Sequence, residues 1–265
     1  MPDYVCIVGL EDSQAEAIAE RIDLPVVSHM IIPGIAVKNG ELWVESGRGP
    51  RMVRAYKVVY HGIYDNDLDF ISALALWGGA CLPNPLGMMD CRLKLPNLVR
   101  ALRFTRFGAP MRGYVSPHIR YDAEIESVAK WGNWHCGENK ERFSGVWQGD
   151  EPAIIEPFLE GQAVRVVIIG ERYWQIKLEG DSWLKSIHHT NADFMDVDEE
   201  LLADTQAVRQ GFGLEIIAND YIVSNDGSKH LLEVNHIPNV DRFPEIWQAY
   251  CDYVVEWLNR MPQAA

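Results

Sequence analysis

The sequence predicts a mixed protein of the α/β (α+β) class. Short apolar runs typical of strands alternate with segments of helical periodicity along the chain. The 265 residues are 48% apolar, which is enough to form a sizeable folded core. A late strand, Leu-Leu-Glu-Val-Asn at 231–235, carries a carboxylate and an amide at alternate positions. This strand is the most informative feature for function.

Residues 1–89 predict a small α/β unit. Asp12 or Ser13 can cap the first helix, and Asn39-Gly40 has the composition of a hairpin turn. The expected elements are a strand at 3–10, a helix at 11–22, a hairpin at 35–45, a strand at 56–63, a helix at 67–80 and a break at 81–87.

Residues 90–158 predict a second segment. A helix at 94–106 is expected to bury Leu95, Leu98, Val99 and Leu102 on its inner face. A charged helix is expected before residue 127, followed by a strand that ends at Lys130. The loop after Lys130 contains Gly132 and Gly137, and such a loop can hold a phosphate through its backbone N–H groups. An ordinary turn is the alternative, and GxxxxGK[ST] is absent.

Residues 159–265 predict a third segment, in which a strand, a turn and a strand come before the last helix. The turn is Asn225-Asp226-Gly227, and Gly211 or Gly213 is expected to end the preceding helix. The expected elements are two strands around 170–171, a helix at 196–213, two strands within 216–240 that the turn joins, the second of them at 231–235, and a helix at 244–259.

Three oxygen donors are expected to meet on these last strands. Glu233 and Asn235 alternate along one strand, so they point to the same face, and a hairpin partner can bring Asp220 beside them. Two carboxylates and an amide oxygen form a hard-oxygen site that suits Mg²⁺. The alternative is a solvated strand face with no metal.

The charge balance argues against nucleic acid as a partner. The chain has 24 basic and 38 acidic residues, a net charge of −14, which repels polyanions. The stretch 91–121 is different, because it holds seven basic residues and no acidic one. It predicts a local anion site, or, for Arg100, Arg103 and Arg106, a solvated helix face. If Arg112 and Arg120 face the cleft, a substrate rich in carboxylates is expected, and pairing with surface acids is the alternative.

No membrane segment or leader is expected, because the chain starts without a basic leader and lacks a run of about 18 apolar residues. The expected location is the cytoplasm. The five cysteines form no CxxC pair, which predicts reduced thiols. A zinc site at His135-Cys136 or His188-His189 is disfavoured, because adjacent residues on a strand point apart.

Several motifs together resemble the ATP-grasp superfamily, closest to its RimK-like and glutathione-synthetase-like carboxylate–amine ligases. They are Lys94 ahead of Ala109-Pro110, Lys130 with its glycine loop, "IIEPFLEG", Arg165, Asp220 and "LLEVNHIP". The resemblance implies an ATP-grasp fold. Its small N-terminal pre-ATP-grasp domain would span 1–89, and two α+β lobes at 90–158 and 159–265 would clamp ATP.

The same resemblance implies roles for individual residues. Nucleotide contacts fall on Lys94, Lys130, Gly132, Gly137, Glu156, Phe158, Leu159 and Glu160. Metal ligands fall on Asp220, Glu233 and Asn235, with Mg²⁺ as the ion and Mn²⁺ as an alternative. Basic residues at the reacting phosphates fall on Arg165, Lys177 and Lys185. The loop 131–140 is expected to be mobile and to close over ATP.

Two positions depart from the family pattern. Ala163 stands where related ligases often have an acid for the ribose, so Glu160 is the substitute, and "WLKSIHHT" replaces an Arg-x-Asn stretch. The implied activity is ATP-dependent joining of a carboxylate to an amine through an acyl phosphate. The acceptor would be an amino acid, a peptide or a protein, and the sequence leaves a homo-oligomer open. The alternative is a non-catalytic module that binds nucleotide or a partner.

Overall fold

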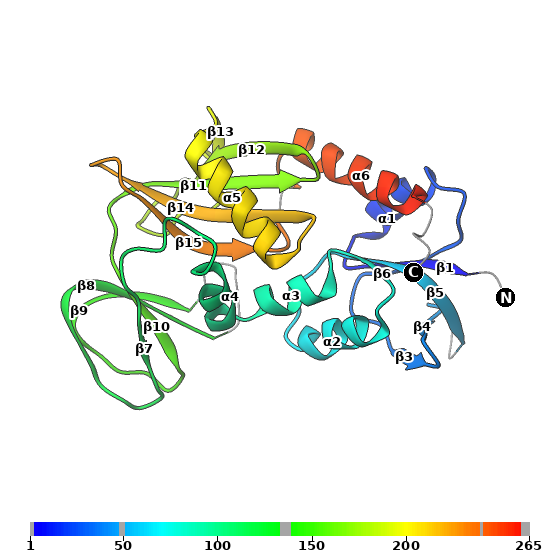
Figure 1. The fold of residues 1–265 in the computed structure, drawn as a ribbon, viewed down its shortest axis with the longest axis horizontal. Coiled ribbons are helices and arrows are strands. Elements are labelled where there is room, and N and C mark those ends of the chain that lie inside the picture. The colour runs from blue at the N-terminus through cyan, green and yellow to red at the C-terminus, as the bar shows by residue number, and fades with distance from the viewer. Residues whose placement is uncertain (1–2, 48–50, 133–138, 239–240, 261–265) are drawn as a thin grey trace.

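Three β-sheets and six helices form the computed structural model, which describes residues 3–47, 51–132, 139–238 and 241–260. The first and third sheets lie next to each other, and the second sheet stands apart beside helix α4 (Figure 1). No helix in these described ranges has both the length and the apolar character needed to cross a bilayer.

The first sheet has the strand order β2-β1-β5-β4-β3, with β6 paired to β5. Strands β1, β2, β5 and β6 are parallel, and β3 and β4 form the expected hairpin, in which Asn39 and Gly40 have φ values of 54° and 76°. The elements are β1 (Tyr4–Val8), α1 (Asp12–Ala19), β2 (Val26–His29), β3 (Ile35–Lys38), β4 (Glu41–Glu45), β5 (Met52–Tyr60), α2 (Asp67–Trp77), β6 (Ala80–Leu82) and α3 (Pro85–Arg92).

Two local predictions in this region were wrong. The N-cap of α1 is Glu11 rather than Asp12 or Ser13, and its N–H donates to Gln14 Oε1 at 3.0 Å. The expected break at 81–87 instead contains the end of β6 and the start of α3. The Asn84 side chain accepts a hydrogen bond from Leu86 N, and proline occupies the first helical turn, where its missing N–H costs nothing.

The second sheet is antiparallel, with the order β7-β10-β8-β9. Its elements are β7 (Gly113–Val115), β8 (Tyr121–Trp131), β9 (Lys140–Trp147) and β10 (Ala153–Pro157), and α4 (Lys94–Ala101) precedes them. The charged helix expected before residue 127 was therefore wrong. Residues 121–126 belong to β8, where residues 121–123 pair with β9 and the strand continues into the ladders with β9 and β10 from Ser127 on, so tertiary pairing overrides local propensity.

Helix α4 also differs from its prediction. It ends at Ala101, and its buried residues are Asn97 and Ala101. The side chains expected inside are largely outside, since Leu95, Val99 and Leu102 are 39%, 57% and 41% exposed. The helix is amphipathic as expected, but its inward face is the one that carries Lys94 and Asn97. These two side chains line a cavity inside the protein.

The third sheet has the order β13-β12-β11-β14-β15 and is antiparallel throughout. Helices α5 and α6 pack on its opposite faces, α5 against one core cluster and α6 against another (Figure 1). The elements are β11 (Gly161–Ile169), β12 (Arg172–Lys177), β13 (Asp193–Met195), α5 (Glu199–Phe212), β14 (Ile216–Ser224), β15 (Lys229–Asn235) and α6 (Pro244–Asn259).

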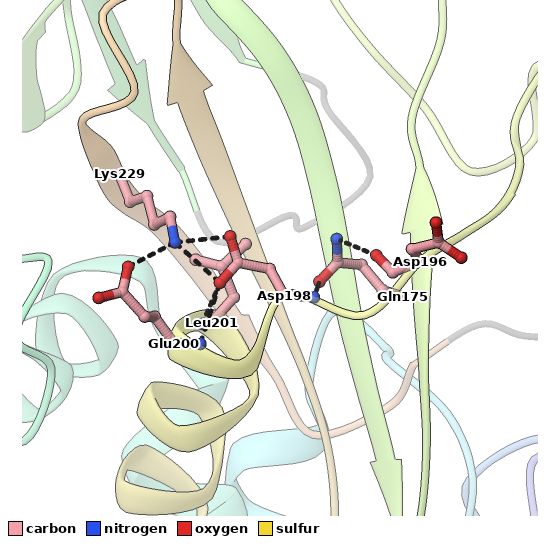
Figure 2. Close-up of polar contacts among 6 residues, drawn as sticks. All are labelled: Gln175, Asp196, Asp198, Glu200, Leu201 and Lys229. Carbon is pink, nitrogen blue, oxygen red and sulfur yellow. Dashed lines mark hydrogen bonds and ion pairs between the residues drawn. The ribbon is translucent and has the colours of Figure 1, made fainter.

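Side-chain contacts fix where α5 begins and how it meets the sheet (Figure 2). Asp198 caps the helix by accepting hydrogen bonds from Glu200 N and Leu201 N, and Lys229 of β15 forms ion pairs with Asp198 and Glu200 at 2.5 and 2.6 Å. The helix ends at Gly213, as predicted, in the left-handed conformation that glycine adopts freely.

The first and third sheets share apolar packing. Cys6 and Val58 belong to the same buried cluster as Val164 and Val166, and α1 contacts α6. A separate small cluster fills the second sheet around Trp147. The division of the chain at residues 89 and 158 stays a prediction.

Candidate active site

The two predicted carboxylates lie side by side in a cleft. Asp220 of β14 is paired in register with Glu233 of β15, and Ala218 is paired with Asn235. Directly opposed residues of antiparallel strands project to the same face. Both carboxylates line the cleft, and their side chains are only 15% and 14% exposed. A solvated strand face does not account for this sheltered position.

Basic side chains face both carboxylates. Arg165 of β11 is in register with Asp220, and its Nε and second terminal nitrogen donate to the two carboxylate oxygens at 2.6 and 2.8 Å. Its remaining terminal nitrogen donates to Pro238 O at 3.0 Å. Lys140 of β9 lies 3.6 Å from Glu233. The predicted phosphate-binding Arg165 is therefore positioned by a predicted metal ligand.

The third predicted ligand, Asn235, is buried at 6% exposure. Its Nδ2 has no hydrogen-bond partner among the described residues, so no hydrogen bond from that nitrogen fixes the orientation of the amide. Within the same residues there is no group of three or more His, Cys, Asp or Glu that could hold a metal. Two carboxylates and one amide oxygen fit a hard cation such as Mg²⁺, which commonly keeps several waters in its shell.

Three lysines converge at the inner end of the cleft. Lys94, Lys130 and Lys140 line one cavity with Glu156 and Glu233, and Lys94 Nζ donates to Trp131 O at 2.9 Å. Burial lowers the pKa of Lys94 to about 8; the charges of Lys140 and Lys130 add to the shift, and Glu233 opposes it. A cluster of partly desolvated ammonium groups is a strong site for an anion.

Lys140 was missed by the sequence reasoning. It follows the glycine loop in the same way that Lys130 precedes it, and the two residues are paired across β8 and β9. A lysine at each end of a glycine loop was the signal available. Gly132, with φ of 65°, is described, whereas Gly137 and most of the loop predicted to be mobile lie outside the described residues.

Glu156 is held by two cations at the base of the cleft. It is 6% exposed, and its carboxylate pairs with Lys130 and, at 2.6 Å, with Arg112 Nε. Burial alone would raise the pKa of Glu156, but Lys130 and Arg112 outweigh burial and hold that pKa below its usual value. Arg112 also donates to Leu231 O.

The two arginines proposed to face a cleft do not line it. Arg112 is committed to Glu156 and to backbone carbonyls, and Arg120 is 64% exposed and pairs with Asp122 at 3.3 Å. The lining of the two cavities beside Glu233 includes neither residue. Of the seven basic residues at 91–121, Lys94 is the one that appears in the lining of these two cavities.

The outer part of the cleft is apolar and aromatic. Phe158 packs edge-on against Trp183, with ring centroids 6.1 Å apart, and the Arg142 guanidinium lies 3.6 Å from the Phe158 centroid. Phe158 N donates to Glu126 O, while no such bond from Leu159 N is found in the described chain. The cleft has about 1010 Å³ of empty space, its open mouth included.

The residues at which the sequence departs from the family pattern can be located relative to the cleft. Ala163 is 4% exposed and forms part of the apolar wall, whereas Glu160 is exposed and does not line the cleft. Lys185 lines the cleft and donates to Gly180 O at 3.3 Å. Lys177 does not line it; its side chain is 46% exposed and pairs with Glu179 at 2.6 Å.

Comparison with known proteins gives several structural neighbours. The ligase PsnB complexed with a minimal precursor matches with a TM-score of 0.67 and 15% identity, over 98% of this chain and 100% of that chain. The macrocyclase MdnC of Microcystis aeruginosa bound with the precursor peptide MdnA gives 0.64 and 14%, over 96% and 99%. D-alanyl-alanine synthetase A of Vibrio cholerae gives 0.67 and 12%, over 97% of both chains.

Comparison of sequences alone finds less similarity than comparison of structures. No family model matches the sequence. Inositol-tetrakisphosphate 1-kinase of Xenopus laevis is 22% identical over 151 residues, 46% of this chain, and the match spans only 38% of the length of that protein. The structural neighbours instead match nearly their whole lengths. The chain therefore has the fold of the ATP-grasp ligases.

Proposed function

We propose that this protein is an ATP- and Mg²⁺-dependent carboxylate–amine ligase that acts through an acyl phosphate. The observation that carries the proposal is the register of Asp220 opposite Glu233 in a cleft that Lys130 and Lys140 also line. Glu233, Lys130 and Lys140 also line the adjoining cavity, which contains Lys94. Asn235, two residues on from Glu233, is outside the lining of both cavities. The arrangement places hard oxygen donors beside a cluster of ammonium groups, as a metal-bound triphosphate requires.

The nucleotide base fits the outer, apolar part of the cleft. Phe158 and Trp183 supply aromatic walls. The N–H of Phe158 already donates to Glu126 O, so we assign the contact with the base to the N–H of Leu159, for which no backbone acceptor is found in the described chain. Two structures of the neighbour PsnB contain ADP with Mg and a third contains AMPPNP, which supports a nucleotide here. Glu160 is a weaker candidate for the ribose because it lies outside the cleft lining.

The phosphates would lie against Lys94, Lys130 and Lys140. Glu156 and Arg112 hold Lys130 in place, so its ammonium is oriented before the nucleotide arrives. Asp220, Glu233 and Asn235 would hold Mg²⁺, with Mn²⁺ as an alternative, and the bound metal would neutralise charge on the phosphates. Arg165 is paired with Asp220 and Lys185 lines the cleft, so these two cations would meet the reacting phosphates, whereas Lys177 is outside the cleft lining.

The proposed chemistry has two balanced steps. A carboxylate oxygen of the acid substrate attacks the γ-phosphorus, the bond to the ADP oxygen breaks, and an acyl phosphate and ADP form. An amine then attacks the acyl carbon, the carbon–oxygen bond to phosphate breaks, and the amide, phosphate and a proton are released. Arg165, Lys130 and Lys185 stabilise negative charge on the phosphoryl oxygens, and the apolar wall excludes water that would hydrolyse the acyl phosphate.

The acceptor class extends from an amino acid to a peptide or a protein. PsnB and MdnC are complexed with precursor peptides, which supports a peptide among the substrates to be tested first. The three predicted domains at 1–89, 90–158 and 159–265 fit this proposal, because the cleft lies between the second sheet and the third.

Isotope transfer tests the mechanism. The acid substrate is labelled with ¹⁸O in its carboxylate, and the released phosphate is analysed by mass spectrometry. Transfer of one ¹⁸O atom to phosphate together with amide formation is expected, because the phosphate that leaves the acyl phosphate keeps the bridging oxygen that came from the carboxylate. ADP formation without labelled phosphate would contradict the acyl-phosphate route.

The likeness to an inositol phosphate kinase favours one second candidate, phosphoryl transfer to a hydroxyl group. A kinase would form ADP and a phosphorylated product without free phosphate and without an amine requirement. Nucleotide binding with no turnover on either substrate class would instead support the non-catalytic alternative.

A further inference from the structure

Arg242 makes an unusual set of contacts at the start of α6. Its first terminal nitrogen donates to Ile187 O at 2.5 Å and to His189 O, and its second donates to Thr190 O at 2.9 Å. A single guanidinium thus satisfies three backbone carbonyls within four residues. Lysine cannot reproduce this pattern, because its ammonium lacks the planar fork of donors.

These carbonyls belong to a segment that reaches the cleft. We call residues 178–192, between β12 and β13, the cleft loop. Trp183, Leu184, Lys185 and Ser186 of this loop line the cleft. Its first half is closed by pairing of Ser186 with Glu179, where Ser186 N donates to Glu179 O at 2.8 Å. Its second half carries the three carbonyls that Arg242 holds.

Arg242 is itself firmly placed. Its guanidinium carbon lies 5.3 Å from the centroid of the Phe243 ring, Phe243 is 7% exposed, and the Phe243 and Phe194 rings are 5.0 Å apart. Ile187 is buried at 4% in the same core cluster as Phe243. Arg242, which we call the anchor, therefore connects the cleft loop to the core under α6.

The anchor also lies close in sequence to the proposed metal ligands. Asn235 ends β15, Pro238 O accepts from Arg165, and Arg242 follows a few residues later. One short stretch of chain is thus tied to Arg165 at one end and to the cleft loop at the other. The cation that would meet the phosphate, Lys185, and the oxygen donors that would hold the metal share this support.

We propose that Arg242 is a positioning residue that holds the cleft loop so that Lys185 and Trp183 face the bound nucleotide. The inference rests on the proposed function for the role of Lys185, but the anchoring itself does not depend on it. Without the fork, the three carbonyls lose their partner and the loop samples open conformations. Each open conformation lowers the fraction of protein that is competent to bind.

The first experiment measures the loop directly. Hydrogen exchange of amides 183–192 is compared in the ligand-free wild type, Arg242→Gln, Arg242→Lys and the control Arg120→Gln, which removes an exposed arginine outside the cleft. Exchange in this loop should increase in both Arg242 variants and stay unchanged in the control. The proposal would be overturned if amides 183–192 of Arg242→Lys exchanged at the wild-type rate. Global unfolding of Arg242→Lys would overturn it too, because either result denies the guanidinium a specific role in holding the loop.

The second experiment tests whether the anchor acts through Lys185. Affinity for AMPPNP is measured calorimetrically for Arg242→Lys, Lys185→Gln and the double variant. Arg242→Lys should weaken binding about tenfold, which corresponds to roughly 1.4 kcal/mol. The double variant should be no weaker than the weaker single variant, because a displaced Lys185 has already lost its contact. Fully additive losses would overturn the proposal. Neither measurement needs turnover, so absence of ligase activity would contradict the proposed function and leave the anchoring proposal standing.

Discussion

Asp220 and Glu233 face each other directly across the β14–β15 ladder, and both line the cleft. Each carboxylate has a cation near it, Arg165 at 2.6 Å and Lys140 at 3.6 Å. The register accounts for the acid in the run Leu-Leu-Glu-Val-Asn, because it places Glu233 opposite Asp220 in the cleft. The predicted role of this pair as a metal site can be tested by removing charge alone.

Glu233→Gln and Asp220→Asn keep the side-chain shape but remove a charge that would hold Mg²⁺. Turnover should fall about a hundredfold or more, roughly 3 kcal/mol, while the fold survives. The measurements are ATP consumption and the thermal shift that Mg²⁺ produces with AMPPNP. Asp122→Asn is the control, since that side chain is 72% exposed. Unchanged metal dependence in both variants would remove the basis for the site.

Nucleotide affinity should depend on pH through Lys94. Its pKa is lowered to about 8, chiefly by burial, so the ammonium form that attracts phosphate predominates only below that pH. Binding of ATP in the presence of a chelator should weaken as pH rises through about 8, by at most about tenfold per pH unit for one proton. Lys94→Arg stays charged and should abolish this dependence. A wild-type affinity that is flat from pH 7 to 9.5 would argue against Lys94 as a phosphate contact.

Arg112 should stabilise the protein rather than bind substrate. Arg112→Met leaves the buried Glu156 with Lys130 as its one remaining cation partner in the described chain, so the free energy of unfolding should fall by about 3 kcal/mol. Arg120→Met should change it by less than about 0.5 kcal/mol, because Arg120 is exposed. Denaturant unfolding of both variants provides the comparison, and equal losses would contradict the structural role.

Acid should destabilise the fold partly through His61. Its Nδ1 is buried without a hydrogen-bond partner in the described chain, and the ring packs against Tyr250 with centroids 4.9 Å apart. Burial lowers the pKa of His61 from 6.5 to about 4, and Asp241 opposes the shift. The unfolded chain then binds more protons than the folded one between these values, so stability falls as pH drops through that window. His61→Gln should show a shallower fall in unfolding free energy between pH 6.5 and 4.

The sequence by itself determined the elements whose signals are local. Gly213 ends α5, Asn39-Gly40 and Asn225-Asp226-Gly227 form the turns of two hairpins, and strand alternation places Glu233 and Asn235 on one face. Such signals depend on caps, turns and periodicity over a few residues. The ATP-grasp fold itself was implied by the resemblance of several motifs, in their order along the chain, to that superfamily.

Only the tertiary structure decided which charged residues meet and which helix face is buried. Arg112 lies 44 residues from Glu156 in sequence, and Arg242 lies 55 residues from Ile187, so no local pattern links them. The apolar stripe of α4 shows the same limit, because Leu95, Val99 and Leu102 have the periodicity of a buried face yet are exposed. Periodicity shows that a helix has two faces, but the faces of the other elements decide which one loses its water.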